Sequence, residues 1–200
     1  MRTIAILAAR PPEEGKTRLA SALPEGDRYR LNINMFRHVL NISSEIFAAT
    51  DMLVVTRSAD LRSIAAEHGV ESVVESGAEL NAAFAQARSV AVELGADRLV
   101  TLSSDLPYIE IGDIEALLAT PGDVVIAPDR HGTGTNALML SPPDAIDFFY
   151  GHDSCQRHMD AAISRGRTLN LLKRPGLASD VDLPVELAEL LARPVRADLA

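Results

Sequence analysis

Short apolar runs alternate along this 200-residue chain with longer stretches whose apolar residues recur at helical spacing. Runs of four to seven apolar or β-branched residues, closed by turn residues, are typical of strands buried on both faces. The predicted strands are residues 3–9, 52–56, 70–75, 99–102, 124–127, 136–140 and 169–172. Strands that alternate with helices form a mostly parallel sheet covered by helices on both faces. We therefore expect a single α/β domain over residues 1–200, with residues 3–9 as its central strand.

The helices are predicted from apolar spacing and from residues that favour helix ends. Leu31, Met35, Val39, Ile42 and Ile46 form a helical stripe, for example. The predicted helices are 27–46 with Asp27 as N-cap, 58–68 starting at Ser58 or Asp60, 81–94, 114–118, 145–150, 154–165 with Ser154 as cap, and 184–191 with Pro184 in its first turn.

Charge and composition exclude several classes of protein. The net charge of −9 argues against general nucleic-acid binding. Residues 1–40 nevertheless hold seven Arg and Lys against four Asp and Glu, which suits a small anionic ligand better than a polymer. Cys155 is the only cysteine, so one chain offers no disulfide and no cysteine-based zinc site. No apolar run reaches the roughly 18–20 residues of a membrane span, and the amino end resembles no signal peptide. We expect a soluble cytoplasmic protein.

Asp105 follows the predicted strand 99–102 in the stretch LVTLSSDLPYI. Ligands of open α/β sheets bind just beyond the carboxyl ends of strands, and Pro107 fixes the direction of the outgoing chain. A carboxylate at this place commonly holds a metal ion against a phosphate. It can equally cap its own turn, and the stretch alone does not decide between these two interpretations.

The loop after the first predicted strand carries Arg10, Lys16 and Arg18 around Gly15. Only its end, Gly15-Lys16-Thr17, matches the phosphate-binding pattern G-x-x-x-x-G-K-[ST], and G-x-G-x-x-G is absent. Cations at the carboxyl end of a central strand can bind a triphosphate, Arg through forked hydrogen bonds and Lys as a point charge. Taken alone, the pattern favours a solvated basic loop.

Two further loops are candidate anion sites. In HGTGTN at 131–136, closely spaced glycines among Thr and Asn residues favour ligand contact, although a hairpin turn gives the same pattern. In GHDS at 151–154, the first N–H groups of the following helix can bind an anion, although capping alone would explain Ser154. His158, one turn further on, is interpreted as a structural histidine.

Asp180-Val181-Asp182 supplies partners for Asp105. In an extended segment, residues i and i+2 point the same way, so the two carboxylates face one side while Val181 faces the core. Three converging carboxylates repel one another unless a divalent cation such as Mg²⁺ neutralises them. A turn before the helix at Pro184 is the simpler alternative.

Together these motifs resemble one family, the 2-phospho-L-lactate guanylyltransferases. The family includes enzymes that accept phosphoenolpyruvate or 3-phosphoglycerate, and it belongs to the molybdenum-cofactor-type nucleotidyltransferases. The matching stretches span nearly the whole chain: GKTRLA at 15–20, LNAAF at 80–84, SSDLP at 103–107, APDRHGTGTNAL at 127–138, YGHDSCQRH at 150–158 and SDVDLPVEL at 179–187. The resemblance implies a Rossmann-like fold of the nucleotide-diphospho-sugar transferase type and a GTP-dependent step in making a deazaflavin coenzyme.

The resemblance also implies roles for particular residues. Asp105, Asp180 and Asp182 would hold one or two Mg²⁺ ions, and Asp105, Lys16 and Arg18 would be the catalytic group, with Lys16 and Arg18 facing the GTP phosphates. Arg10, Lys16, Arg18 and Asn81 would lie on the GTP side, and Thr135, Asn136, Gly151 and Ser154 on the side of the acceptor's phosphate. One departure concerns Arg10, because the family usually has Pro-Val-Lys where this chain has Ala8-Ala9-Arg10.

The implied reaction is consistent with these residue types. An oxygen of a phosphate monoester attacks the α-phosphorus of GTP and expels pyrophosphate. The second pKa of such a phosphate is about 6, so it is largely dianionic at neutral pH and needs no general base. Positioning and neutralisation of the anions are what the protein must supply. The rival interpretations are a nucleotide-sugar glycosyltransferase and a non-catalytic nucleotide-binding regulatory protein. Apolar residues near 148–150 are the candidate interface of a homodimer.

Overall fold

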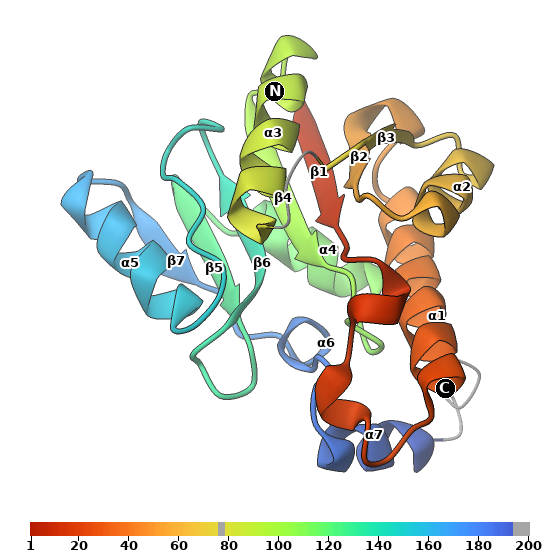
Figure 1. Ribbon diagram of the computed structural model, residues 1–200. Coiled ribbons are helices and arrows are strands. Elements are labelled where there is room, and N and C mark those ends of the chain that lie inside the picture. Colours follow the sequence, from red (N-terminus) through yellow and green to blue (C-terminus); the bar gives the residue numbers. More distant parts are fainter. Residues whose placement is uncertain (76–78, 194–200) are drawn as a thin grey trace.

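A seven-stranded sheet organises the protein, described here from a computed structural model that covers residues 1–75 and 79–193 (Figure 1). Its strand order is β3-β2-β1-β4-β6-β5-β7. Only β6 runs antiparallel to its neighbours, so the predicted mostly parallel α/β sheet is confirmed. The strands are β1 Thr3–Ala8, β2 Met52–Val55, β3 Glu71–Val73, β4 Arg98–Ser103, β5 Val124–Pro128, β6 Thr135–Leu140 and β7 Leu169–Leu171.

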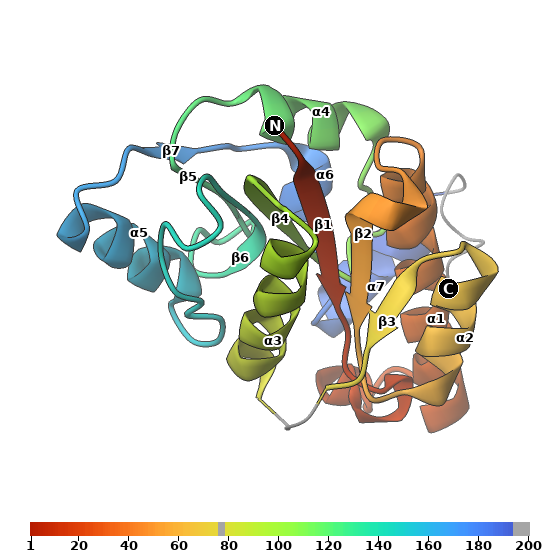
Figure 2. The ribbon, with the colours of Figure 1, turned by 90° about the horizontal axis from the view of Figure 1, so that it is seen from above.

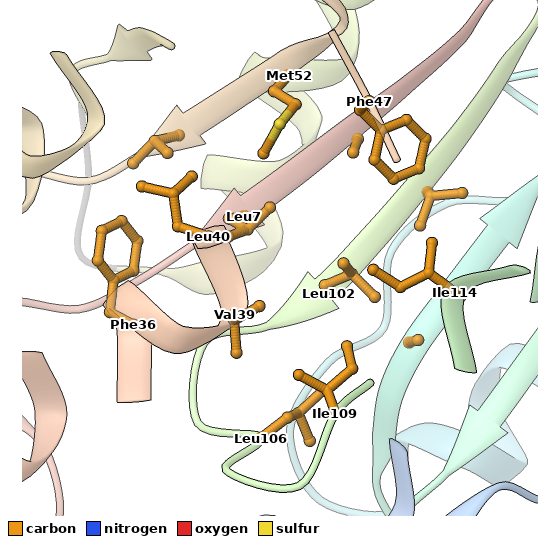
Figure 3. Close-up of a cluster of buried hydrophobic side chains, with 14 of the residues drawn as sticks. Leu7, Phe36, Val39, Leu40, Phe47, Met52, Leu102, Leu106, Ile109 and Ile114 are labelled. Atoms are coloured by element: carbon orange, nitrogen blue, oxygen red, sulfur yellow. The ribbon is translucent and has the colours of Figure 1, made fainter. Parts of the chain in front are cut away.

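The central strand β1 is buried on both faces, as its continuous apolar run predicts. Ile4 and Ile6 pack into the cluster that includes residues of α3 (Leu80–Glu93) and α5 (Ser154–Ser164). The alternate residues Ala5 and Leu7 pack into the opposite cluster with α1 (Glu25–Ser44), α2 (Ala59–Glu67) and α4 (Ile111–Ala119). Figure 3 shows this second cluster around Leu7, and Figure 2 shows α3 and α4 on opposite sides of β1 and β4.

A third, smaller apolar cluster joins the segment 19–35 to the segment 181–190. It contains Leu19 from the turn η2 (Thr17–Leu19), Leu31 and Met35 from α1, Val181, and residues of α7 (Pro184–Leu191). Figure 1 shows the loop after β1 beside α7 accordingly. The remaining short elements are η1 Pro12–Glu14, η3 Ala49–Asp51 and α6 Pro175–Ala178, none of which was predicted. The third apolar cluster places the basic loop that follows β1 against the segment before α7, which contains Asp180 and Asp182.

The helix predicted over residues 145–150 is wrong. The backbone N–H of Phe149 donates to Nε2 of His158 at 2.9 Å, and that of Tyr150 donates to Oδ1 of Asn81 at 2.6 Å. These donors therefore bond to side chains of other elements instead of to carbonyls one helical turn back. Phe148 is 6% exposed and packs on Phe84, so it is no part of an exposed apolar interface.

Two predicted caps are also wrong. Helix α1 starts at Glu25, two residues before Asp27, because the N–H of Arg28 bonds to the carbonyl of Pro24. Ser154 is the first residue of α5, after an N-cap at Asp153 with left-handed backbone. The N-cap at Ser58 and the place of Pro184 in the first turn of α7 are confirmed. Within the described residues no helix has the length and apolar character needed to span a bilayer.

Candidate active site

Three carboxylates meet beyond the carboxyl end of β4. Asp105 follows that strand, and Asp180 and Asp182 lie between α6 and α7. Oxygen atoms of the three side chains lie within 4.8 Å of one another. Val181 between the two aspartates is fully buried, so both neighbouring carboxylates face the same way, as the i, i+2 spacing predicts. The structure thus brings together the three residues predicted to hold a metal ion.

Lys16 lies among these carboxylates. Its Nζ donates hydrogen bonds to Asp105 and, at 2.8 Å, to Oδ1 of Asp182, and its side chain is only 6% exposed. Burial would lower the pKa of Lys16, but the charges of Asp105 and Asp182 outweigh it and raise that pKa above its ordinary value. Arg18 is the second cation, with Nη1 3.7 Å from Asp182, and it is mostly exposed. Lys16 is therefore a fixed positive charge in the acidic cluster.

The backbone around Lys16 is built for this placement. Lys16 has a φ of 55°, in the left-handed region that residues with a side chain seldom adopt. A Cβ on the preceding Gly15 would lie 2.6 Å from Nδ2 of Asn32, which donates a hydrogen bond to the carbonyl of Pro12 at 2.7 Å. Backbone strain of this kind is held in place by the surrounding structure and occurs often at functional sites.

The electrostatics of the cluster fit a divalent cation. Burial and the charge of Asp105 raise the pKa of Asp180 to about 6, so the ionised form of Asp180 is disfavoured. Asn136 partly offsets this by donating from Nδ2 to Oδ1 of Asp180 at 3.2 Å, and it also bonds to the carbonyl of Leu177. Burial opposes ionisation of Asp182, but Lys16 and then Arg18 lower its pKa. Oxygen ligands whose negative charges repel one another are a suitable donor set for Mg²⁺.

A cleft of about 410 Å³ opens beside the cluster. Lys16, Asp105 and Asp182 line its polar part, together with Arg10 and Arg18. The remaining walls include Ala8, Phe36, Leu80, Phe84 and Tyr150. The cleft can therefore hold a ligand with an anionic part and a flat apolar part, which is the character of a nucleotide.

Asn81 does not face this cleft as a free group. Its Nδ2 donates to the carbonyl of Tyr150 at 3.1 Å, and its Oδ1 accepts the N–H of the same residue. The Tyr150 hydroxyl bonds to Oγ1 of Thr101 at 2.5 Å. Asn81 thus holds Tyr150 in the wall of the cleft and is not itself among the residues that line it.

The two predicted acceptor loops contact each other at the amino end of α5. The loop 129–134 is a hairpin between β5 and β6, in which Oδ1 of Asp129 accepts the N–H of Thr133 at 2.8 Å. The carbonyl of Thr133 accepts the N–H of Cys155 at 3.0 Å. Thr135 then bonds to His158 of α5. The buried Ser154 is the first residue of that helix, and its N–H donates to the carbonyl of Gly151, which has a φ of 117°. Thr135, Gly151 and Ser154 are thus on neighbouring segments.

Sequence reasoning missed the position of Lys16 inside the acidic cluster and the contribution of Tyr150 to the cleft. The left-handed backbone at Lys16 has no sequence signature beyond the preceding glycine. Tyr150 lay in a predicted helix, and its contact with Asn81 joins residues 69 positions apart, which no local pattern reveals.

Comparison with known proteins gives a consistent result. Residues 3–194 match the family described as "Guanylyl transferase CofC like". The chain is 36% identical to a phosphoenolpyruvate guanylyltransferase of Sphaerobacter thermophilus, covering 95% of this chain and 93% of the relative. It is 32% identical to a 3-phospho-D-glycerate guanylyltransferase of Colwellia psychrerythraea, covering 100% and 97%.

The fold is also found among solved structures. A crystal structure from Desulfovibrio desulfuricans G20, described provisionally as a nucleotide-diphospho-sugar transferase, superposes with a TM-score of 0.79 at 20% identity, covering 96% of this chain and 87% of the other. This likeness confirms the expected fold type. The match over nearly the whole chain, with relatives above 30% identity, shows that this protein belongs to the CofC-like guanylyl transferase family.

Proposed function

We propose that this protein transfers the guanylyl group of GTP to the phosphate of a small phosphorylated carboxylic acid and releases pyrophosphate. The observation that carries the proposal is the meeting of Lys16 with Asp105, Asp180 and Asp182 at the polar part of a nucleotide-sized cleft. Membership of the guanylyl transferase family supports GTP as the nucleotide that would bind in this cleft. The acceptors to consider are phosphoenolpyruvate, 3-phosphoglycerate and 2-phospholactate, of which the first two appear in the names of relatives.

Each group of residues has a distinct task in this proposal. Arg10 and Arg18, both exposed, would bind the β- and γ-phosphates at the mouth of the cleft, and Lys16 would bind an oxygen close to the α-phosphorus. The three aspartates would hold Mg²⁺, which, when bound, neutralises phosphate oxygens and the leaving pyrophosphate. Lys16 lies too deep to be a mobile surface charge, which makes it the residue best placed to act during transfer.

The acceptor phosphate would lie between the hairpin loop and α5. Thr135 and the first turn of α5, including Ser154 after Gly151, would donate hydrogen bonds to its oxygens. Asn136 would act less directly, because it is bonded to Asp180 and orients that carboxylate. The acceptor phosphate is dianionic at neutral pH, so the site needs no side chain as a base. This fits a candidate site rich in Asp, Lys and Arg.

Release of pyrophosphate from GTP, measured with each acid in turn, tests the proposal. We expect release that requires an acid, requires Mg²⁺, and is lost in Asp105→Asn while the circular dichroism spectrum is unchanged. Transfer of a sugar from a nucleotide sugar would identify a glycosyltransferase instead. Binding of GTP without release, with every acid, would indicate a regulatory protein.

A further inference from the structure

His158 is a buried histidine for which the proposed chemistry has no use. It lies on α5, is 0% exposed, and contacts two groups through its two ring nitrogens. Nδ1 lies 3.0 Å from Oγ1 of Thr135, and Nε2 lies 2.9 Å from the backbone nitrogen of Phe149. The rings of Phe149 and Tyr150 pack edge-on against it. Such a ring has little freedom to turn.

These two contacts define which nitrogen carries the hydrogen. The N–H of Phe149 is a donor, so Nε2 of His158 must accept and carries no hydrogen of its own. In the neutral ring the hydrogen is then on Nδ1, which donates to Oγ1 of Thr135. The ring stays neutral because burial, aided by the charge of Arg157, lowers the pKa of His158 to about 4.

The consequence falls on the hydroxyl of Thr135. Its oxygen accepts from His158, so its own hydrogen must be donated to another group. Among residues 1–75 and 79–193 no acceptor for that hydrogen is found, although Thr135 is only 5% exposed. A buried hydroxyl that is obliged to donate and has no protein acceptor is suited to an oxygen of a bound ligand.

Thr135 lies at the correct edge of the sheet for such a ligand. In the antiparallel pair, Leu102 of β4 is opposite Ala137 of β6. Moving outward from that pair, β4 leads to Asp105 while β6 leads back to Asn136 and Thr135. Asn136 itself contacts Asp180 of the acidic cluster. The Thr135 hydroxyl therefore lies on the side of the site where the proposed acceptor must approach the α-phosphorus.

We propose that His158 is a positioning residue that forces the Thr135 hydroxyl to donate its hydrogen to the phosphate of the acceptor. The proposal rests on the proposed function for the identity of the ligand. Phe149 takes part in this positioning, because its N–H donates to Nε2 of His158 and so keeps the ring hydrogen on Nδ1. The same segment also holds Tyr150 in the cleft wall through Asn81, so the acceptor side and the nucleotide side share one support.

The state of the ring can be measured in the wild-type protein without turnover. Nuclear magnetic resonance of protein labelled with ¹⁵N at histidine distinguishes a nitrogen that carries hydrogen from one that does not. We expect His158 to carry hydrogen on Nδ1 and to stay neutral at pH 6. A hydrogen on Nε2 or a charged ring at that pH would overturn the proposal.

Two substitutions then separate positioning from simple packing. His158→Asn keeps an N–H at the position of Nδ1, whereas His158→Gln reaches only the position of Nε2. We expect His158→Gln to raise the KM of the acid about 3- to 10-fold, the effect of one lost hydrogen bond, with the KM of GTP unchanged. His158→Asn should restore a KM within about twofold of the wild type.

A double substitution tests whether the effect passes through Thr135. In a Thr135→Val background, which lacks the hydroxyl, His158→Gln should have no further effect on the KM of the acid. Thr135→Ser, which keeps the hydroxyl, is the control in which His158→Gln should act as in the wild type. An equal rise of KM in the Thr135→Val background, or an equal rise for GTP, would overturn the proposal. If wild-type protein releases no pyrophosphate with any acid, the proposed function fails. The measurement of the His158 ring needs no turnover, so it distinguishes that failure from a failure of the positioning proposal.

Discussion

The Nζ of Lys16 lies 2.8 Å from Oδ1 of Asp182, a residue 166 positions further along the chain. The contact is supported by nearby apolar packing, since Leu19, three residues after Lys16, and Val181, next to Asp182, belong to the same buried cluster. The basic loop after β1 and the acidic segment before α7 are thereby held as one unit. The geometry of the site thus depends on side chains that touch no ligand.

Truncation of the supporting cluster is expected to weaken the site from a distance. Leu19→Ala removes a fully buried side chain and should lower the free energy of unfolding by about 2–5 kcal/mol. It should also lower the affinity for Mg²⁺, because Lys16 and Asp182 lose their common support. Leu191→Ala, the same change at a residue that is 53% exposed on α7, is the matched control. Calorimetric Mg²⁺ titrations of both variants that agree with the wild type would contradict this account.

Lys16 and Arg18 are expected to differ greatly in importance. Lys16→Met removes a buried charge from the transfer site and should lower kcat/KM about 100-fold or more. Arg18→Met removes an exposed charge and should cost less than about tenfold, mainly in the KM of GTP. Lys16→Arg should not restore activity, because a forked guanidinium does not fit where one ammonium lies between two carboxylates. A larger loss in Arg18→Met than in Lys16→Met, in steady-state assays, would refute the assignment.

Asp180 is expected to lower the stability of the protein when metal is withheld. Its folded-state pKa of about 6 is above the ordinary 3.8, so the folded state holds its proton more tightly and stability falls as pH rises from about 4 to 6. In a chelating buffer at pH 8, Asp180→Asn should therefore raise the free energy of unfolding by up to about 3 kcal/mol. The same variant should lose activity when Mg²⁺ is supplied. Asp144→Asn, at an exposed carboxylate, should change neither quantity.

A higher free energy of unfolding in Asp180→Asn than in the wild type would show that the aspartates lower the stability of the folded protein. Urea denaturation with and without chelator measures this difference. Equal stability of Asp180→Asn and wild type in the chelating buffer would remove the argument for carboxylate repulsion.

Acid is expected to destabilise the protein through His158. The folded-state pKa of about 4 is below the ordinary 6.5, so the unfolded chain binds a proton first as pH falls. Stability should decrease between pH 6.5 and 4 by up to about 3 kcal/mol from this residue alone. Urea midpoints across this range should show a shallower slope in His158→Gln than in the wild type. Identical slopes would mean that His158 takes up its proton as readily in the folded protein as in the unfolded chain.

The sequence predicted the sheet correctly because the apolar runs that mark its strands are strong and local signals. The apolar run of β1 predicts a strand buried on both faces, and the structure confirms it through the alternate packing of Ile6 and Leu7. The helix predicted at 145–150 failed because Asn81 and His158, both distant in sequence, take the N–H groups of Tyr150 and Phe149. Spacing along the chain contains no information on such partners.

The candidate site was partly predictable for the same reason. The i, i+2 spacing of Asp180 and Asp182 specifies that both carboxylates face one way, whatever the rest of the fold does. The position of Lys16 depends on a left-handed backbone and on the packing of Leu19 against α1 and α7. That position follows only once the tertiary structure is known, so the sequence did not predict the ion pairs of Lys16 with Asp105 and Asp182.

Transfer of label from GTP marked with ³²P at the α-phosphorus tests the central claim most directly. With Mg²⁺ and the three acids supplied separately, we expect the label to appear in a guanosine diphosphate adduct of at least one acid, with unlabelled pyrophosphate released and no transfer in Asp105→Asn. Label that appears only in free GMP, or that enters no acid at all, would contradict the assignment of guanylyl transfer to this site.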